Sequence, residues 1–214
     1  MRCDIMVVRD ASAGVPAYIA RHVKDHVSIL NAGESDVSHP TQGLLDLLTI
    51  RRHKGSFENL VVSIVGVIRH SRVARSTGWG LNTLGVGELR LVSPPSMAPD
   101  PDDMPFATIC DNLDEGLAGA DVVMALRIQR ERISDLEGIP GTEEYFSAYG
   151  VSHERMKLAR PDAIVMHPGP MNRGIEIEGN LADSNQSVIT EQVANGVAFR
   201  MAELERVAKS LGGN

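Results

Sequence analysis

Four short segments of the sequence concentrate side chains that could bind anions or polarise a carbonyl group. Each combines Arg or His with small or hydrogen-bonding residues, and they span residues 39–42, 69–76, 127–132 and 167–174. Arg9 adds a further cation near the start of the chain. Arginine forms bidentate hydrogen bonds with carboxylates and phosphates, and helix starts that follow strands add partial positive charge. Together, the segments predict a site for a small ligand with several negative charges.

Taken singly, each segment also has a simpler interpretation. A basic run such as 69–75 is usually a solvated helix face. His39 could be an N-terminal helix residue, and His167 could be a buried histidine at the end of a strand. The functional interpretation therefore depends on whether the fold brings the segments together.

Nearly all-apolar runs precede these segments and predict strands that are buried on both faces. The expected strands span residues 5–8, 27–30, 60–68, 89–93, 120–126 and 163–166. Segments with helical spacing are found at 15–24, 40–52, 71–84, 113–118, 152–158 and 187–211. Strands that alternate with helices predict an α/β fold with doubly wound parallel sheets. Ligands of such sheets bind beyond the carboxyl ends of the strands, where the Arg- and His-bearing segments begin.

The composition excludes several classes of protein. The 28 acidic and 21 basic residues give a net charge of −7, which argues against a nucleic-acid partner. The two cysteines have no metal-binding or disulfide-type spacing, so a cytoplasmic location is expected. The longest apolar run, 60–68, is far shorter than the ~20 residues that span a membrane. Because the dinucleotide, P-loop, serine-hydrolase and zinc-protease patterns are missing from the sequence, a transferase or lyase that acts by orientation and electrostatics remains.

In order and spacing, the segments resemble the catalytic chain of the aspartate carbamoyltransferases over essentially the whole sequence. The motifs are His-Pro-Thr-Gln at 39–42, His-Ser-Arg-Val-Ala-Arg-Ser at 70–76, Arg-Ile-Gln-Arg-Glu-Arg at 127–132 and His-Pro-Gly-Pro-Met-Asn-Arg-Gly at 167–174. The ornithine enzymes share the first signature but lack the third, so they rank second. The resemblance implies carbamoyl transfer from carbamoyl phosphate to L-aspartate, giving N-carbamoyl-L-aspartate and phosphate for pyrimidine biosynthesis. It also implies a homotrimer that needs no metal or organic cofactor.

The resemblance assigns roles on the carbamoyl side of the site. Arg9 and His39 would polarise the carbonyl oxygen of the carbamoyl group, which is an oxyanion-type role. Gln42 would hold the carbamoyl nitrogen. These residues would therefore activate the group that is transferred.

On the acceptor side, the resemblance implies that Arg72 and Arg127 bind the two carboxylates of aspartate, with Gln129 beside them. The backbone carbonyls of Pro168 and Gly169 would orient the attacking amine. The peptide bond after Gly169 would be cis, a geometry that is accessible at low cost only before proline.

Two domains are implied, of which the first is incomplete. Residues 1–53 would form part of a carbamoyl-phosphate-binding domain, joined by the helix at 187–211, and residues 54–186 would form the aspartate-binding domain. The family's Ser-Thr-Arg-Thr loop, which grips phosphate, and its Lys-bearing loop, which enters a neighbouring subunit's site, have no counterpart in the sequence. We therefore expect an N-terminally truncated chain that, alone, binds carbamoyl phosphate poorly and turns over little.

Two main hypotheses remain open. The chain could be an enzyme whose missing segment comes from another polypeptide or from a longer chain of which this sequence is part. Alternatively, it could be a non-catalytic relative that binds dicarboxylates or acts as an assembly subunit. Asp10 and Val67 stand where the family usually has His and Asp. A nucleic-acid-binding module built on 69–75 is a third alternative, which the net charge disfavours.

Overall fold

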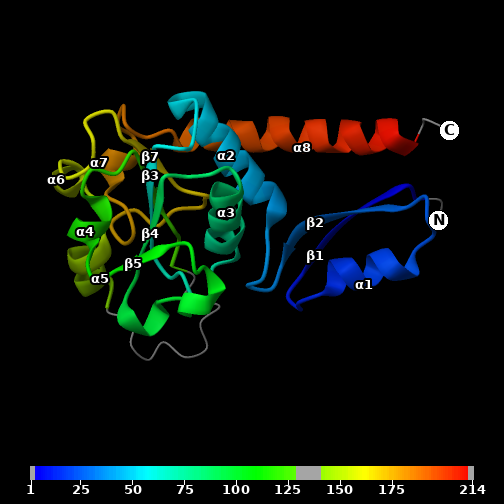
Figure 1. Cartoon of the computed structure of the whole chain (residues 1–214), viewed down its shortest axis with the longest axis horizontal. Coiled ribbons are helices and arrows are strands. Elements are labelled where there is room, and N and C mark those ends of the chain that lie inside the picture. The colour runs from blue at the N-terminus through cyan, green and yellow to red at the C-terminus, as the bar shows by residue number, and fades with distance from the viewer. Residues whose placement is uncertain (1–2, 129–140, 212–214) are drawn as a thin grey trace.

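The computed structural model describes residues 3–128 and 141–211 and contains two parallel sheets (Figure 1). One sheet has the strand order β5-β4-β3-β6-β7, and the other pairs β1 with β2. The strands are β1 (Ile5–Asp10), β2 (Ser28–Glu34), β3 (Val61–Val65), β4 (Glu88–Val92), β5 (Thr108–Cys110), β6 (Val122–Ala125) and β7 (Ile164–Met166). The helices are α1 (Val15–His22), α2 (Pro40–Lys54), α3 (Arg72–Thr83), α4 (Leu113–Leu117), α5 (Thr142–Tyr149), α6 (His153–Met156), α7 (Gly179–Ala182) and α8 (Ile189–Leu211), with 3₁₀ turns η1 (Pro95–Met97) and η2 (Pro101–Asp103). None of these helices, within the described ranges, is long and apolar enough to cross a membrane.

Helices cover both faces of the five-stranded sheet, which confirms the predicted α/β class. The central strand β3 pairs in parallel with β4 and β6. Ile64 packs in the core cluster that contains Leu81 of α3, whereas the next residue, Val65, packs in the cluster that contains Leu117 of α4. Figure 1 shows α3 on one side of the sheet and α4 and α6 on the other. Successive strand residues point to opposite faces, so uninterrupted apolar runs predict this two-sided burial.

The smaller sheet and α1 form a lobe that projects from the larger sheet (Figure 1). Its strands pair in parallel from Ile5 opposite Ser28 to Asp10 opposite Glu34. Apolar side chains remain exposed in this lobe: Val7 and Tyr18 are each 63% exposed. A two-stranded sheet has little capacity to build its own core. The lobe joins the rest of the molecule where β2 leads into α2.

The C-terminal helix α8 packs on α2 and extends toward the same side as the small lobe (Figure 1). Several of its regularly spaced apolar side chains are more than half exposed, namely Val193, Val197 and Met201. The buried residues of α8 are Ile189, Gln192, Asn195 and Gly196. The apolar spacing therefore predicts the helix correctly but does not identify the face that is buried.

The buried face of α2 also differs from a continuous leucine stripe. Leu44 is 47% exposed, whereas Asp46 and Thr49 are fully buried. No pattern in the sequence predicts β5, α5 or α7. β5 has three residues and α7 has four, which is too short for a hydrophobic period to show.

Replacement of Ile64, which is fully buried in the central strand, should destabilise the fold strongly. Ile64→Ala leaves a cavity in the core, so we expect the free energy of unfolding in urea to fall by about 2–5 kcal/mol. Leu158→Ala, at a side chain that is 44% exposed, is the control and should cost about 0.5 kcal/mol or less. Similar losses in the two variants would contradict the central position of β3.

Candidate active site

A cavity of about 920 Å³ lies where the carboxyl ends of β1, β3, β6 and β7 meet the starts of α2 and α3. All predicted site residues that fall within the described ranges line it: Arg9, His39, Gln42, Arg72, Arg127, Pro168 and Gly169. Gln129 lies outside the described residues. The fold thus brings together segments from both ends of the chain, at the edge where parallel sheets bind ligands.

His39 occupies the N-cap position of α2 and is 9% exposed. Its backbone N–H donates to Ser76 Oγ at 2.8 Å, which ties the start of α2 to α3. The pKa of His39 is lowered from 6.5 to about 4. Burial is the largest cause, followed by the positive charges of Arg72, Arg9 and Arg200. The ring is therefore neutral at pH 7 and keeps one N–H that can donate to a carbonyl oxygen.

Arg72 is the first residue of α3, and the turn after β2 holds its side chain. The guanidinium Nη1 donates to the backbone carbonyl of Ser35 at 3.1 Å. Gly33 lies against the guanidinium, because a Cβ at this position would be 3.2 Å from Arg72 Cζ. The φ of Gly33 is +117°, which L side chains rarely adopt. Because position 33 is glycine, the guanidinium of Arg72 can occupy this space at the cavity wall.

The turn after β7 contains Pro168 and Gly169, and the buried His167 fixes its shape. Gly169 N–H donates to His167 Nδ1 at 2.9 Å. The ring proton must then sit on Nε2, which is 3.2 Å from Glu176 Oε1. The peptide bond after Gly169 is cis, as expected. His167 and Glu176 are 0% and 1% exposed, so the simpler interpretation of His167, a buried structural histidine, is correct.

Three residues at or behind the cavity wall are missed by the sequence analysis: Asp46, Gln192 and Arg200. Gln192 and Arg200 line the cavity from α8, and Asp46 lies buried behind Gln42, whose Nε2 donates to Asp46 Oδ1 at 2.9 Å. An acid four residues after Gln42, among the leucines of α2, is a usable signal because positions i and i+4 share a helix face. Gln192 has no such signal in the sequence, because the apolar spacing of α8 predicts that neighbouring positions are the buried ones.

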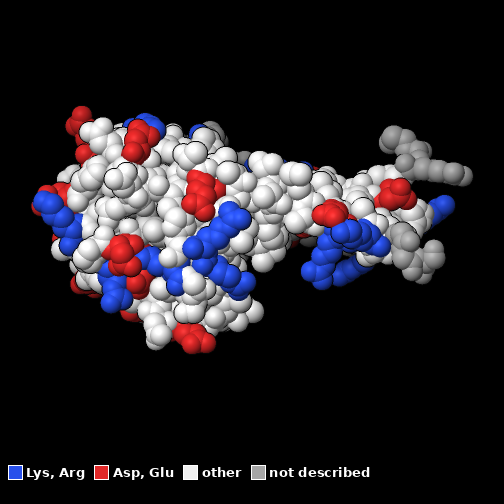
Figure 2. Space-filling model, turned by 90° about the horizontal axis from the view of Figure 1, so that it is seen from above, with Lys and Arg blue, Asp and Glu red and all other residues white. Residues whose placement is uncertain are grey.

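Part of the basic run 69–75 fits the solvated-helix interpretation instead. Arg75 Nη2 lies 2.9 Å from Asp103 Oδ2 and also donates to the backbone carbonyl of Arg69. His70 is at the rim of the cavity, with Nδ1 3.8 Å from Asp36 Oδ2. Figure 2 shows acidic and basic side chains mixed over one face of the molecule. The grouping of cations around the active-site cavity is therefore local.

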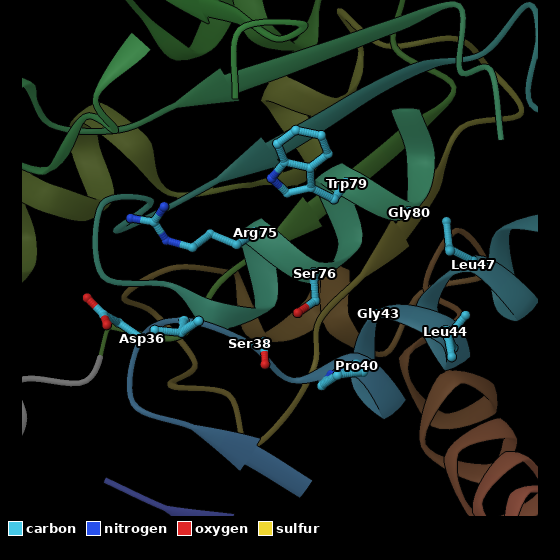
Figure 3. A pocket seen from close by; sticks show the side chains of 11 residues that line it. Asp36, Ser38, Pro40, Gly43, Leu44, Leu47, Arg75, Ser76, Trp79 and Gly80 are labelled. Atoms are coloured by element: carbon cyan, nitrogen blue, oxygen red, sulfur yellow. The ribbon is translucent and has the colours of Figure 1, made fainter. Parts of the chain in front are cut away.

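A second cavity of about 700 Å³ lies between α2 and α3 (Figure 3). Figure 3 shows Arg75 and Asp36 at one end and Leu44 and Leu47 at the other, with Trp79 above. None of the predicted site residues in the described part of the chain lines it. We therefore take the cavity with the converging arginines as the candidate active site.

Within the described ranges, no group of three His, Cys, Asp or Glu side chains is placed to hold a metal ion. The polar groups that line the candidate site are mainly guanidinium, imidazole, amide and backbone carbonyl groups, together with the carboxylates of Asp10 and Asp36. Such a set can bind anions, polarise a carbonyl oxygen and orient an amine.

Comparison with known sequence families agrees with this chemistry. The family described as aspartate/ornithine carbamoyltransferase matches through its Asp/Orn-binding domain at residues 58–207 and through its carbamoyl-P-binding domain at residues 1–52. The chain belongs to this family. The resemblance seen in the sequence motifs is therefore confirmed at the level of the carbamoyltransferases.

Solved carbamoyltransferases share the fold. Aspartate transcarbamoylase from Trypanosoma cruzi, in complex with carbamoyl aspartate and phosphate, is 28% identical, with a TM-score of 0.82, over 94% of this chain and 65% of that chain. Ornithine carbamoyltransferase from Thermus thermophilus is 25% identical, with a TM-score of 0.80, over 95% of this chain and 66% of that chain. The chain thus spans 65–66% of the length of these two relatives. Because both acceptor types occur among them, the acceptor has to be inferred from the site.

The low pKa of His39 has a direct consequence for stability. Between pH 4 and 6.5 the folded protein binds fewer protons at His39 than the unfolded chain does. This residue therefore favours folding above pH 6.5, and its contribution is lost as the pH falls toward 4.

In an NMR titration, the ring of His39 should change protonation near pH 4 rather than near 6.5. Arg72→Ala should raise this pKa, because a positive charge is removed, but not fully to 6.5, because burial persists. Arg75→Ala is the matched control, since that guanidinium is paired with Asp103 outside the cavity, and should leave the pKa unchanged. A wild-type midpoint near 6.5 would contradict the burial and charge described for the site.

Proposed function

We propose that this carbamoyltransferase uses L-aspartate as the acceptor of the carbamoyl group. The amino nitrogen of aspartate attacks the carbonyl carbon of carbamoyl phosphate, a C–N bond forms, and the bond from that carbon to the phosphate oxygen breaks. The products are N-carbamoyl-L-aspartate and phosphate. The observation that carries this proposal is that Arg72 and Arg127 line one cavity together with His39. Two guanidinium groups match the two carboxylates of aspartate, whereas ornithine has one carboxylate and a side-chain amine.

On the carbamoyl side, we assign Arg9 and His39 to the carbonyl oxygen. Negative charge grows on this oxygen as the amine attacks, and a cation and an N–H donor that are already in place stabilise it. Because His39 is neutral near pH 7, it acts as a hydrogen-bond donor rather than as a source of a full positive charge. Gln42 is assigned to the carbamoyl nitrogen.

On the acceptor side, the backbone carbonyls of Pro168 and Gly169 would accept hydrogen bonds from the amine and direct its lone pair at the carbonyl carbon. Holding the two reactants in this orientation converts a bimolecular encounter into a reaction within one complex. The amine loses a proton as the new bond forms, and the departing phosphate can accept it. The turn after β7 thus contributes orientation through its backbone.

We extend the proposal to the assembly and setting that the sequence resemblance implies. These are a homotrimer with sites between subunits, no cofactor, a cytoplasmic location and a role in pyrimidine biosynthesis. The division into a partial carbamoyl-phosphate domain at 1–53, joined by 187–211, and an aspartate domain at 54–186 also stays a proposal. The family matches at 1–52 and 58–207 support the division near residue 53.

The acceptor can be tested by product binding, which needs no turnover. In calorimetry, N-carbamoyl-L-aspartate should bind at least tenfold more tightly than L-citrulline, the product from ornithine, because one more carboxylate meets a guanidinium. The preference should weaken at high salt, since it is partly electrostatic. Tighter binding of L-citrulline would replace aspartate by ornithine as the acceptor.

Removal of either carboxylate-binding arginine should weaken the binding of N-carbamoyl-L-aspartate. A charge-assisted hydrogen bond contributes about 1.5–3 kcal/mol, so Arg72→Ala and Arg127→Ala should each raise the Kd by roughly 10- to 150-fold. Arg75→Ala removes the same charge outside the cavity and is the control. Equal affinity in the Arg127→Ala and Arg75→Ala variants would remove Arg127 from the proposed site.

A further inference from the structure

Asp46 is a carboxylate at 0% exposure that receives hydrogen bonds from three helices. Its Oδ1 accepts from Gln42 Nε2 at 2.9 Å and from Gln192 Nε2 at 2.7 Å. Its Oδ2 accepts from Thr77 Oγ1 at 2.9 Å. The donors belong to α2, α8 and α3. One carboxylate therefore joins the helices whose residues form much of the cavity wall.

The carboxylate of Asp46 fixes the orientation of the side-chain amide of Gln42. An ionised carboxylate can only accept hydrogen bonds, so the Gln42 atom that contacts it must be the nitrogen, Nε2. The amide oxygen, Oε1, is then available on the other side of a residue that lines the cavity. A fixed acceptor at this position suits a ligand group that donates, such as the –NH2 of a carbamoyl group. A methyl group in the same place could not donate.

Gln192 links Asp46 to the turn after β7, because its side-chain amide is oriented in the same way as that of Gln42. Because its Nε2 donates to Asp46, its Oε1 is directed away, and this oxygen accepts from the backbone N–H of His167 at 2.9 Å. That N–H immediately precedes Pro168 and Gly169, which line the cavity. The hydrogen bonds of Asp46 therefore reach both the carbamoyl side and the amine side of the site.

We propose that Asp46 is a positioning residue for carbamoyl transfer, which orients Gln42 to accept a hydrogen bond from the carbamoyl –NH2 and holds the turn at 167–169 through Gln192. The inference rests on the proposed function in requiring a carbamoyl group in the cavity. It does not depend on whether aspartate or ornithine is the acceptor. Asp46 is fully buried and does not line the cavity, so it acts on the site through these two glutamines.

The surroundings of Asp46 support this role. Burial raises its pKa from 3.8 to about 6, while the hydrogen bonds from Gln192, Thr77 and Gln42 and the charge of Arg200 act in the opposite direction. Asp46 is therefore ionised at pH 7. Below pH 6, a proton on Oδ2 can donate to the Thr77 hydroxyl while Oδ1 still accepts from both glutamines, so the orientation persists.

The test compares two ligands that differ only in the donor that Gln42 would recognise. N-carbamoyl-L-aspartate carries –NH2 where N-acetyl-L-aspartate carries a methyl group of similar size, and both have the same two carboxylates. We expect the wild-type chain to bind the carbamoyl ligand about tenfold more tightly in calorimetry, since the methyl group leaves a buried acceptor unpaired. A ratio of two affinities is insensitive to a general loss of stability.

Variants at position 46 separate positioning from packing. Asp46→Leu keeps much of the volume but removes the acceptor, so the affinity ratio should fall to about threefold or less. Asp46→Asn keeps an oxygen for both glutamines and offers –NH2 to the Thr77 hydroxyl, so it should preserve the ratio. Thr49→Val is the matched control, because Thr49 is also fully buried in α2 and accepts from Asn195 Nδ2 of α8 at 2.9 Å. This control should keep the wild-type ratio.

A wild-type measurement keeps the inference testable if Asp46→Leu does not fold. The side-chain amide protons of Gln42 should shift in NMR with a midpoint near pH 6 as Asp46 gains its proton. The charged group of α8 that acts on Asp46 is Arg200, and His39 at the start of α2 titrates lower, near pH 4. A shift of the same size and midpoint in Asp46→Asn would overturn the contact on which the inference depends.

The outcomes distinguish this inference from the proposed function. If both aspartate ligands bind equally well, or if Asp46→Leu keeps the wild-type ratio, the positioning role is wrong while aspartate recognition stands. If the aspartate pair does not bind but L-citrulline is preferred over Nδ-acetyl-L-ornithine, the choice of aspartate is wrong and the positioning role stands. If neither pair binds, both proposals fail.

Discussion

Guanidinium groups that share a cavity repel one another, and Arg9 of β1, Arg72 at the start of α3 and Arg127 after β6 line one cavity. Grouped cations favour the binding of anions, although the carboxylates of Asp10 and Asp36 line the same cavity. The charges of Arg72, Arg9 and Arg200 add to burial in keeping His39 neutral. In the proposed function, the cations that bind the anionic substrates would thus also set the protonation state of the residue assigned to the carbonyl oxygen.

Directional polar contacts, rather than apolar packing alone, set the position of α2 against α8. Asp46 accepts from Gln192, and one turn later Thr49 accepts from Asn195. Buried hydrogen bonds are satisfied in one relative position of two helices, whereas apolar surfaces can slide with smaller cost. His39 caps the start of α2 and Gln42 lies in its first turn. Fixing α2 against α8 therefore also fixes where these two side chains lie in the candidate site.

The sequence predicts every described strand except β5, the longer helices other than α5, and most of the cationic residues that line the cavity, because each depends on a local pattern. Apolar runs mark buried strands, and ligands of parallel sheets bind where these runs end. The face of α8 that is buried could not be predicted, because Val197 and Met201 have the spacing of a core stripe and are nevertheless exposed. Asp46 was not predicted to be buried, although its spacing of four residues from Gln42 is a signal that the two side chains share a helix face. A single acidic residue in a helix is usually a surface residue, and its burial depends on donors from α3 and α8 that only the tertiary structure brings near.

Gly33 contributes no functional group, yet Arg72 occupies the space that any side chain at this position would need. The proposed recognition of a carboxylate by Arg72 therefore depends on the absence of a side chain about forty residues earlier in the sequence. In a map of mutational tolerance, position 33 would resemble a ligand-binding residue although nothing at this position can touch a ligand through a side chain. A search for functional residues by chemical type alone passes over such a position.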